Sequence, residues 1–185
     1  QVGMLYNLVY NRDCMIHVIT NVVRSGSPFE AVIKPVAESF FGEGCVDAPK
    51  AYTPINENKV KLAKWALNEK QWHDSATLCN WMYPMMLSTS KKRGYKGDLE
   101  LDAKYMSAVV GEDYQRADIE CDSERITQML RAMTAISFKL NLGSTNLRKD
   151  HDAIPAWVFD KGPDFKAFEE GTVKLDREDF AKALD

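Results

Sequence analysis

Residues 124–142 read ERITQMLRAMTAISFKLNL, a run in which apolar side chains return at helical spacing. This spacing predicts one long amphipathic helix with a buried stripe along one side. Asp122 or Ser123 is expected to cap its start, and Gly143 to end it. We expect Met129 and Met133 to be ordinary core residues. The whole expected stripe consists of Ile126, Met129, Leu130, Met133, Ile136, Phe138 and Leu140.

Further helical signals lie on the N-terminal side of that run. Residues 14–24 carry apolar side chains at helical spacing. Ser27 is expected to cap a second helix that Pro35 kinks and Gly42 ends. Asn56 is expected to cap a long amphipathic helix whose lysines face water. The expected buried stripe of this helix consists of Val60, Leu62, Ala63, Ala66 and Leu67.

The remaining segments add short helices and almost no strand signals. Residues 101–110 are predicted to form a short helix with Asp102 near its beginning. Residues 176–185 begin another helix, with Phe180, Ala183 and Leu184 on one face. The basic, glycine-containing residues 91–97 are predicted to form a solvated surface turn. We therefore predict an all-α fold.

The composition is that of a soluble globular protein. Hydrophobic residues make up 45% of the 185 residues and charged residues 28%, which argues against disorder of the whole chain. The net charge is -3 with Lys and Arg spread along the chain, so no nucleic-acid partner is expected. The apolar stretches are too short to span a bilayer, and no signal peptide is apparent. We expect no transmembrane segment and a cytoplasmic location.

The four cysteines, Cys14, Cys45, Cys79 and Cys121, lie far apart in the chain. A chain of this length needs no disulfides to fold, so reduced thiols in the cytosol are expected. The ordinary role of such a thiol is that of a small buried apolar side chain.

The sequence DSATLC, residues 74–79, places one cysteine between a long helix and an apolar segment. Because cysteine thiolates hold iron–sulfur clusters, Cys79 is a candidate iron ligand. One cysteine cannot bind a cluster, however, and the chain has no Cys-x-x-Cys or similar set to complete one. From these residues alone, a buried structural cysteine and an iron ligand both remain open.

The same run resembles the Asp-x-x-Gly-Leu-Cys motif of the aldehyde ferredoxin oxidoreductase family. Asp74, Leu78 and Cys79 match the motif, whereas Thr77 stands where the family has Gly. Because Thr adopts positive φ only at a steric cost, Thr77 is unfavourable for the tight turn of the motif. The resemblance implies that Asp74 and Leu78 bind a pterin. It also implies that Cys79 is the fourth ligand of a [4Fe-4S] cluster whose other three ligands lie upstream.

Two further stretches extend the resemblance over nearly the whole chain. Residues 148–155, RKDHDAIP, are similar to the family's Arg-Lys-Asp-Asp-x-x-Pro region, which follows a long helix beginning Glu-Arg-Ile, here residues 124–126. Residues 175–180, LDREDF, resemble the opening of the family's last helix. The implied fold is the multi-helix C-terminal domain of the family. In it, residues 1–90 would face the cofactors and residues 91–185 would form an outer helical part.

The two ends of the chain lead to an expectation about its completeness. The chain starts at Gln1 without an initiator Met, and its last predicted helix has no terminator. We expect a piece of a longer polypeptide, truncated at both ends. Alone, this piece is expected to be inactive and to hold no cofactor.

Near the start, residues 11–17, NRDCMIH, resemble a loosened form of the family's Arg-Gly-x-x-His segment, whose His lies near the substrate cavity. The resemblance makes His17 a candidate proton donor, since imidazole exchanges protons near neutral pH. A hydrogen-bonded core histidine on an apolar helix is the alternative.

The resemblance implies an oxidoreductase with a tungsten or molybdenum bis-pterin and one [4Fe-4S] cluster in the full-length protein. It would carry out low-potential two-electron chemistry on an aromatic acyl-CoA, as benzoyl-CoA reductases do, or on an aldehyde. The implied partners are the missing N-terminal domains and a ferredoxin or iron–sulfur electron-transfer subunit.

Two other classes of protein compete with the enzyme. One is a non-catalytic helical interaction domain, which predicts a polar surface without an exposed apolar face. The other is a small metal-binding protein that uses Cys and His. His73 has no second Cys or His at metal spacing, so we expect it to be a surface or supporting group. His151, between two carboxylates, is expected to belong to a salt-bridged loop.

Overall fold

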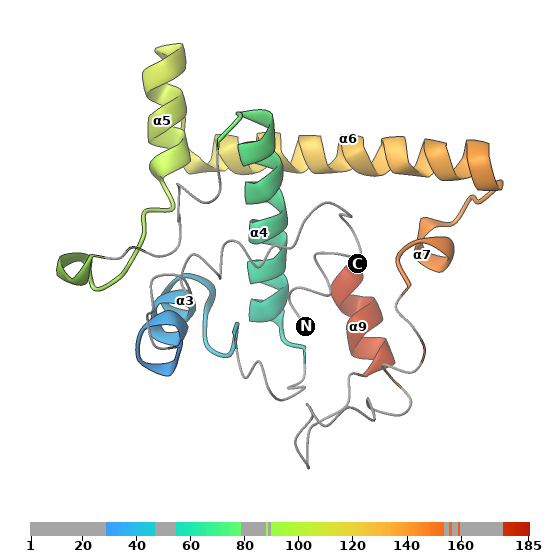
Figure 1. Cartoon of the computed structure of the whole chain (residues 1–185), viewed down its shortest axis with the longest axis horizontal. Coiled ribbons are helices and arrows are strands. Elements are labelled where there is room, and N and C mark those ends of the chain that lie inside the picture. Colours follow the sequence, from blue (N-terminus) through green and yellow to red (C-terminus); the bar gives the residue numbers. More distant parts are fainter. Residues whose placement is uncertain are drawn as a thin grey trace.

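The computed structural model describes residues 29–46, 55–78, 88, 90–153, 156, 159 and 176–185. Within these ranges every regular element is a helix, which confirms the predicted all-α fold (Figure 1). In chain order the elements are η1 (Phe29–Ile33), α3 (Lys34–Phe41), α4 (Glu57–Ser75), η2 (Lys91–Arg93), α5 (Leu101–Val110), α6 (Arg116–Leu142), α7 (Leu147–Asp150) and α9 (Arg177–Leu184). None of these helices is long and apolar enough to cross a membrane.

Helix α4 begins where the sequence predicts. The side chain of Asn56 accepts a hydrogen bond of 2.8 Å from the Lys59 amide, which confirms the predicted cap. Leu62, Ala63 and Ala66 are buried, as expected of its apolar stripe. The stripe therefore places α4 against the rest of the chain.

The expectation that the lysines of α4 face water is wrong at one position. Lys59 is only 2% exposed, whereas Lys61 and Lys64 are exposed. Lys59 lies three and four residues before Leu62 and Ala63, so it occupies the buried face of the helix. Position on the helix, and not residue type, decides its burial.

Helix α3 follows a π-helical turn. Pro35 lies in the first turn of α3, immediately after η1, at the point where a kink is predicted. Because Pro has no amide N–H, the regular helical bond is lost there and the change of helix type is accommodated. Gly42 ends α3 with φ of 93°, as predicted. The predicted cap at Ser27 and the predicted helix over 14–24 lie outside the described residues.

Two clusters of buried apolar side chains join the helices. In the first, Phe41 of α3 packs on Trp65 of α4 with ring centroids 5.1 Å apart, beside the fully buried Cys45. In the second, Trp72 of α4 meets Ala103 of α5 and Ile119 of α6. The clusters hold α3 on one side of α4, and α5 and α6 near its C-terminal end.

Helix α6 starts earlier than predicted. It begins at Arg116, after Gln115, whose side chain and amide form a reciprocal capping box with Asp118. Ser123, an expected cap, instead donates its hydroxyl to the Ile119 carbonyl inside the helix. The predicted end at Gly143 is confirmed, with φ of 66°.

Much of the predicted buried stripe of α6 is exposed. Met129, Met133, Ile136 and Leu140 are 65%, 60%, 58% and 77% exposed, so Met129 and Met133 are not core residues among the described part of the chain. Helix α4 crosses the N-terminal half of α6, where Asn68 bonds Thr127, and α6 then runs on past it (Figure 1). The pattern predicts an apolar face correctly but not what covers it.

The C-terminal helices are short and follow their caps. Asp176 accepts hydrogen bonds from the Glu178 and Asp179 amides and starts α9, on which Phe180 is buried as predicted. Helix α5 occupies the predicted residues, with its exposed Val109 and Val110 near the end. Residues 91–93 form the exposed turn η2, which confirms the predicted surface turn.

Candidate functional site

The C-terminal end of α4 forms the turn in which the predicted pterin residues lie. Ala76 caps the helix, and the Ala76 amide donates to the Trp72 carbonyl at 2.8 Å. Thr77 follows with φ of 59°, and the Leu78 amide reaches back to the His73 carbonyl at 2.8 Å. This is the bonding pattern of a Schellman turn, which normally has Gly at the left-handed position. Thr77 keeps the turn despite its β-branched side chain.

The strain at Thr77 leads to a prediction. Gly at position 77 should stabilise the protein by about 1 kcal/mol, because Gly adopts positive φ without the steric cost that Thr meets. The midpoint of urea unfolding should rise in Thr77→Gly. Ala76→Gly is the matched control, since Ala76 has φ of -82° and should gain nothing. An unchanged midpoint in Thr77→Gly would mean that the turn carries no strain.

Asp74 presents its carboxylate at the surface of the same turn. Its Oδ1 lies 2.6 Å from Lys70 Nζ, and its side chain is 32% exposed. A carboxylate in this position can accept the paired N–H groups of a pterin ring. The Leu78 N–H is already used within the turn, so Leu78 can offer a pterin only its carbonyl group. The residues of this turn fit a pterin through Asp74.

The other two predicted site residues lie outside the described residues. Cys79 directly follows Leu78 in the chain, and His17 lies in residues 1–28. The structure thus brings Asp74 and Leu78 together in one turn. The roles of Cys79 and His17 remain predictions.

A second group of polar side chains lies one turn before Asp74. His73 is 1% exposed, so of its two expected roles, a surface group or a supporting group, the surface role is wrong. Its Nε2 lies 2.9 Å from Asp102 Oδ2 of α5 and 3.4 Å from Glu69 Oε1 of α4. Burial, followed by the neighbouring Asp102 carboxylate, raises the pKa of Glu69 well above its ordinary value. The Glu69–His73 spacing of four residues is a sequence signal for this group, but no local signal points to Asp102.

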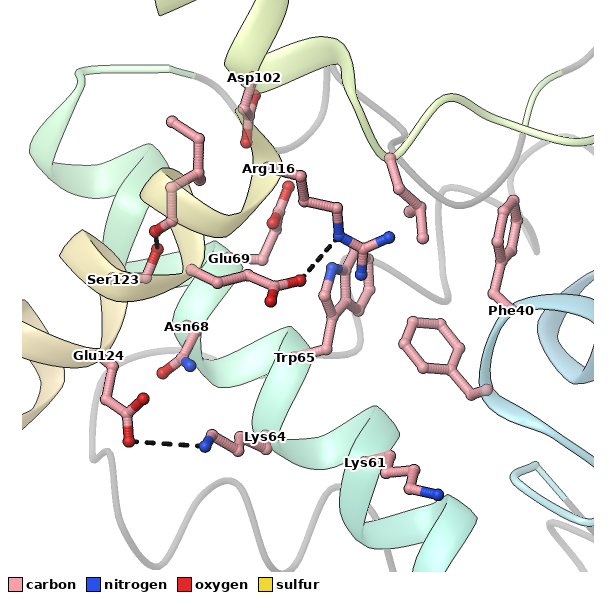
Figure 2. A pocket seen from close by; sticks show the side chains of 14 residues that line it. Phe40, Lys61, Lys64, Trp65, Asn68, Glu69, Asp102, Arg116, Ser123 and Glu124 are labelled. Carbon is pink, nitrogen blue, oxygen red and sulfur yellow. Dashed lines mark hydrogen bonds and ion pairs between the residues drawn. The ribbon is translucent and has the colours of Figure 1, made fainter. Parts of the chain in front are cut away.

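Glu69 and Asp102 also line a pocket of about 320 Å³ between α3, α4, α5 and α6. Figure 2 shows them near Arg116, with the Trp65 indole and Phe40 farther along the wall. Arg116 forms an ion pair with Glu120 at 2.7 Å. The pocket is apolar toward α3 and charged toward α5 and α6.

The second stretch that carries the family resemblance forms an ion-pair cluster around Asp152. The Asp152 carboxylate is fully buried and receives two hydrogen bonds from Arg131 of α6, at 3.0 and 2.6 Å. His151 Nδ1 lies 2.8 Å from the same carboxylate, so His151 belongs to a salt-bridged loop as predicted. Arg148 lies 3.6 Å from it and also pairs with Asp185. The cluster fixes the loop after α7 to α6.

Comparison with known proteins identifies the family. Residues 23–185 match the family model described as aldehyde ferredoxin oxidoreductase, domains 2 & 3. No solved structure matches the chain. The family match spans α3, the α4 turn with Asp74, and the Asp152 cluster alike. Because it covers most of the 185 residues, the chain belongs to the aldehyde ferredoxin oxidoreductase family, whose members are oxidoreductases with a tungsten or molybdenum pterin.

Proposed function

We propose that this chain is the C-terminal part of an oxidoreductase that holds a tungsten or molybdenum bis-pterin and one [4Fe-4S] cluster. The observation that carries the proposal is the turn at the end of α4. There, an accessible Asp74 carboxylate precedes a left-handed residue at the position where the family motif has Gly. A turn of this shape at this position supports the assignment of residues 74–79 to the family motif.

Each residue then has a defined task. Asp74 accepts hydrogen bonds from the pterin, and the carbonyl of Leu78 is the further group that the turn can offer. The Cys79 thiolate bonds iron as the fourth cluster ligand. His17 donates a proton near the substrate. The metal and pterin supply the two-electron redox chemistry when bound.

The substrate and the partners belong to the same proposal. An aromatic acyl-CoA, as in benzoyl-CoA reductases, and an aldehyde are the two substrate classes. Electrons would pass to or from a ferredoxin or an iron–sulfur subunit in the cytoplasm. Residues 1–90 would face the cofactors and residues 91–185 the outside, with further domains of a longer polypeptide completing the enzyme.

The exposed face of α6 supports an enzyme part over the two competing classes. A self-sufficient interaction domain predicts a polar surface, yet five large apolar side chains of α6 are more than half exposed. A small Cys and His metal protein predicts cysteine ligands. The metal-capable group found among the described residues consists of Glu69, His73 and Asp102 and contains no cysteine.

The cluster assignment is tested in the full-length protein with Cys79→Ser. We expect loss of the [4Fe-4S] EPR signal and a fall in iron content, because serine is a poor substitute for a thiolate ligand. Cys121→Ser is the matched control, since Cys121 is exposed on α6 and should leave the iron unchanged. An intact cluster in Cys79→Ser would remove the proposed ligand and, with it, the assigned motif.

A further inference from the structure

Three potential metal ligands from two helices meet in the interior. Glu69 and His73 are four residues apart on α4, which places both side chains on one face of the helix. Asp102 reaches them from the first turn of α5. We propose that Glu69, His73 and Asp102 bind a divalent first-row transition-metal ion, at a site distinct from the pterin metal and the iron–sulfur cluster.

The spacing of the ligand atoms fits such an ion. His73 Nε2 lies 2.9 Å from Asp102 Oδ2 and 3.4 Å from Glu69 Oε1, and the three ligand atoms all lie within 4.8 Å of one another. Metal bonds of about 2.1 Å place neighbouring ligands about 3.0 Å apart in an octahedron and about 3.4 Å apart in a tetrahedron. Small side-chain rotations are therefore enough to surround an ion.

The two buried carboxylates of the site also favour binding of a cation. Glu69 and Asp102 are 8% and 2% exposed. Apart from the 3.4 Å contact of Glu69 Oε1 with His73 Nε2, the Glu69 Oε1 and Asp102 Oδ1 atoms have no hydrogen-bond partner among the described residues. Buried carboxylate oxygens without a partner are costly. Arg116 lies near, but its guanidinium pairs with Glu120. A divalent ion bound between Glu69 and Asp102 would neutralise the charge of both carboxylates.

The ligand set and its surroundings indicate which ions fit. One imidazole and two carboxylates suit Zn²⁺, Mn²⁺ or Fe²⁺ and disfavour soft ions such as Cu⁺. Three protein ligands leave at least one coordination position for water. Glu69 and Asp102 line the 320 Å³ pocket, which gives the ion and its water a route from solvent.

An ion at this site would clamp α5 to α4 next to the functional turn. His73 precedes Asp74 directly, and the His73 carbonyl accepts the Leu78 amide that closes the turn. The ion would thus hold the helix end from which Asp74 projects. Glu69, His73 and Asp102 lie outside the family motif, and ion binding by them does not depend on the pterin or the cluster.

The test measures Zn²⁺ binding to the full-length protein after treatment with a chelator. Equilibrium dialysis should find one tight Zn²⁺ site per chain that Glu69→Gln and Asp102→Asn each weaken at least about 10-fold. Glu124→Gln is the matched control, because Glu124 is an exposed carboxylate of the same pocket that pairs with Lys64, and this variant should bind Zn²⁺ as the wild type does. Equal affinity in all three variants, or no Zn²⁺ site in the wild type, would overturn the proposal.

A second measurement uses the wild-type protein alone and therefore tests the site even if the variants fail to fold. X-ray absorption at the zinc edge of the wild-type protein should show an imidazole and oxygen ligands without sulfur. Sulfur in the shell would place the ion at a cysteine and contradict the site. The outcome is independent of Cys79→Ser, whose effect is read from iron and the cluster EPR signal.

Discussion

Asp152→Asn should lower the free energy of unfolding by about 3 kcal/mol, one of the two largest effects expected of a single substitution in this chain. The Asp152 side chain is fully buried and accepts two hydrogen bonds from Arg131. The substitution removes the negative charge and turns one acceptor into an N–H donor facing a guanidinium. Arg131, only 21% exposed, is then left with an unpaired charge. Urea unfolding of the two proteins measures the difference.

The control for this experiment lies two residues away. Asp150→Asn changes an exposed carboxylate at the end of α7, just before that loop, and an amide can keep its contact with Ser144. It should alter the free energy of unfolding by less than about 0.5 kcal/mol. Equal losses in the two variants would mean that any change of charge in this region lowers the free energy of unfolding. The buried Arg131–Asp152 pair would then contribute no more than an exposed carboxylate.

The pH dependence of the same residue has a definite sign. Burial alone would raise the pKa of Asp152, but the hydrogen bonds and charges of Arg131 and His151 outweigh it and lower the pKa. The folded protein then binds fewer protons than the unfolded chain near the ordinary value of 3.8. The Asp152 contribution is complete above that value and is lost as the pH falls through the lower, folded-state pKa. Asp152→Asn should therefore lose less stability than the wild type on acidification below 3.8.

Local signals in the sequence were sufficient for most helix ends. Asn56, Gly42 and Gly143 begin or end helices as predicted, because caps depend on a few neighbouring atoms. The start of α6 was missed, since Gln115 is not among the usual capping residues and Ser123 is. Local chemistry predicts an end well where the residue type is typical, and poorly where an unusual residue takes the role.

Burial depends on what lies opposite a helix face, which the sequence does not reveal. The sequence predicts the apolar period of α6, yet Met129 and Met133 are exposed because they lie on the side of the helix away from Thr127, which faces α4. Lys59 shows the reverse case, since its place on the packed face of α4 buries a charged residue. A helical period shows which face of a helix is apolar, but it does not show which segment packs against that face.

In the candidate site, too, a local motif predicts some residues, whereas only the packing of helices brings in others. Asp74 and Leu78 are predicted site residues because a family motif spans neighbouring residues, and for the same reason they share one turn. Asp102 was not found, because 29 residues separate it from His73 and only the packing of α5 on α4 joins them. The sequence leaves His73 open between a surface group and a supporting group, because no second Cys or His lies at metal spacing from it.

Trp65→Ala should lower the free energy of unfolding by about 4 kcal/mol, through loss of apolar contacts and the cavity left behind. Trp65 is 8% exposed and packs its indole on Phe41, with ring centroids 5.1 Å apart. It belongs to the cluster that attaches α3 to α4 and also forms part of the pocket wall. Loss of the indole should therefore loosen α3 and raise hydrogen exchange there more than in α9, which lies outside this cluster.

Leu140→Ala provides the comparison that separates burial from size. Leu140 is also a large apolar residue in a helix, but it is 77% exposed, so in residues 1–185 alone its truncation should change the free energy of unfolding by less than about 0.5 kcal/mol. Urea unfolding of both variants tests the contrast. In the full-length protein, a loss at Leu140 close to that at Trp65 would show that a further segment or domain covers the exposed face of α6. The cluster of α3 and α4 would then be only one of two apolar contacts that stabilise the fold, and the exposed stripe would be the surface on which the rest of the enzyme rests.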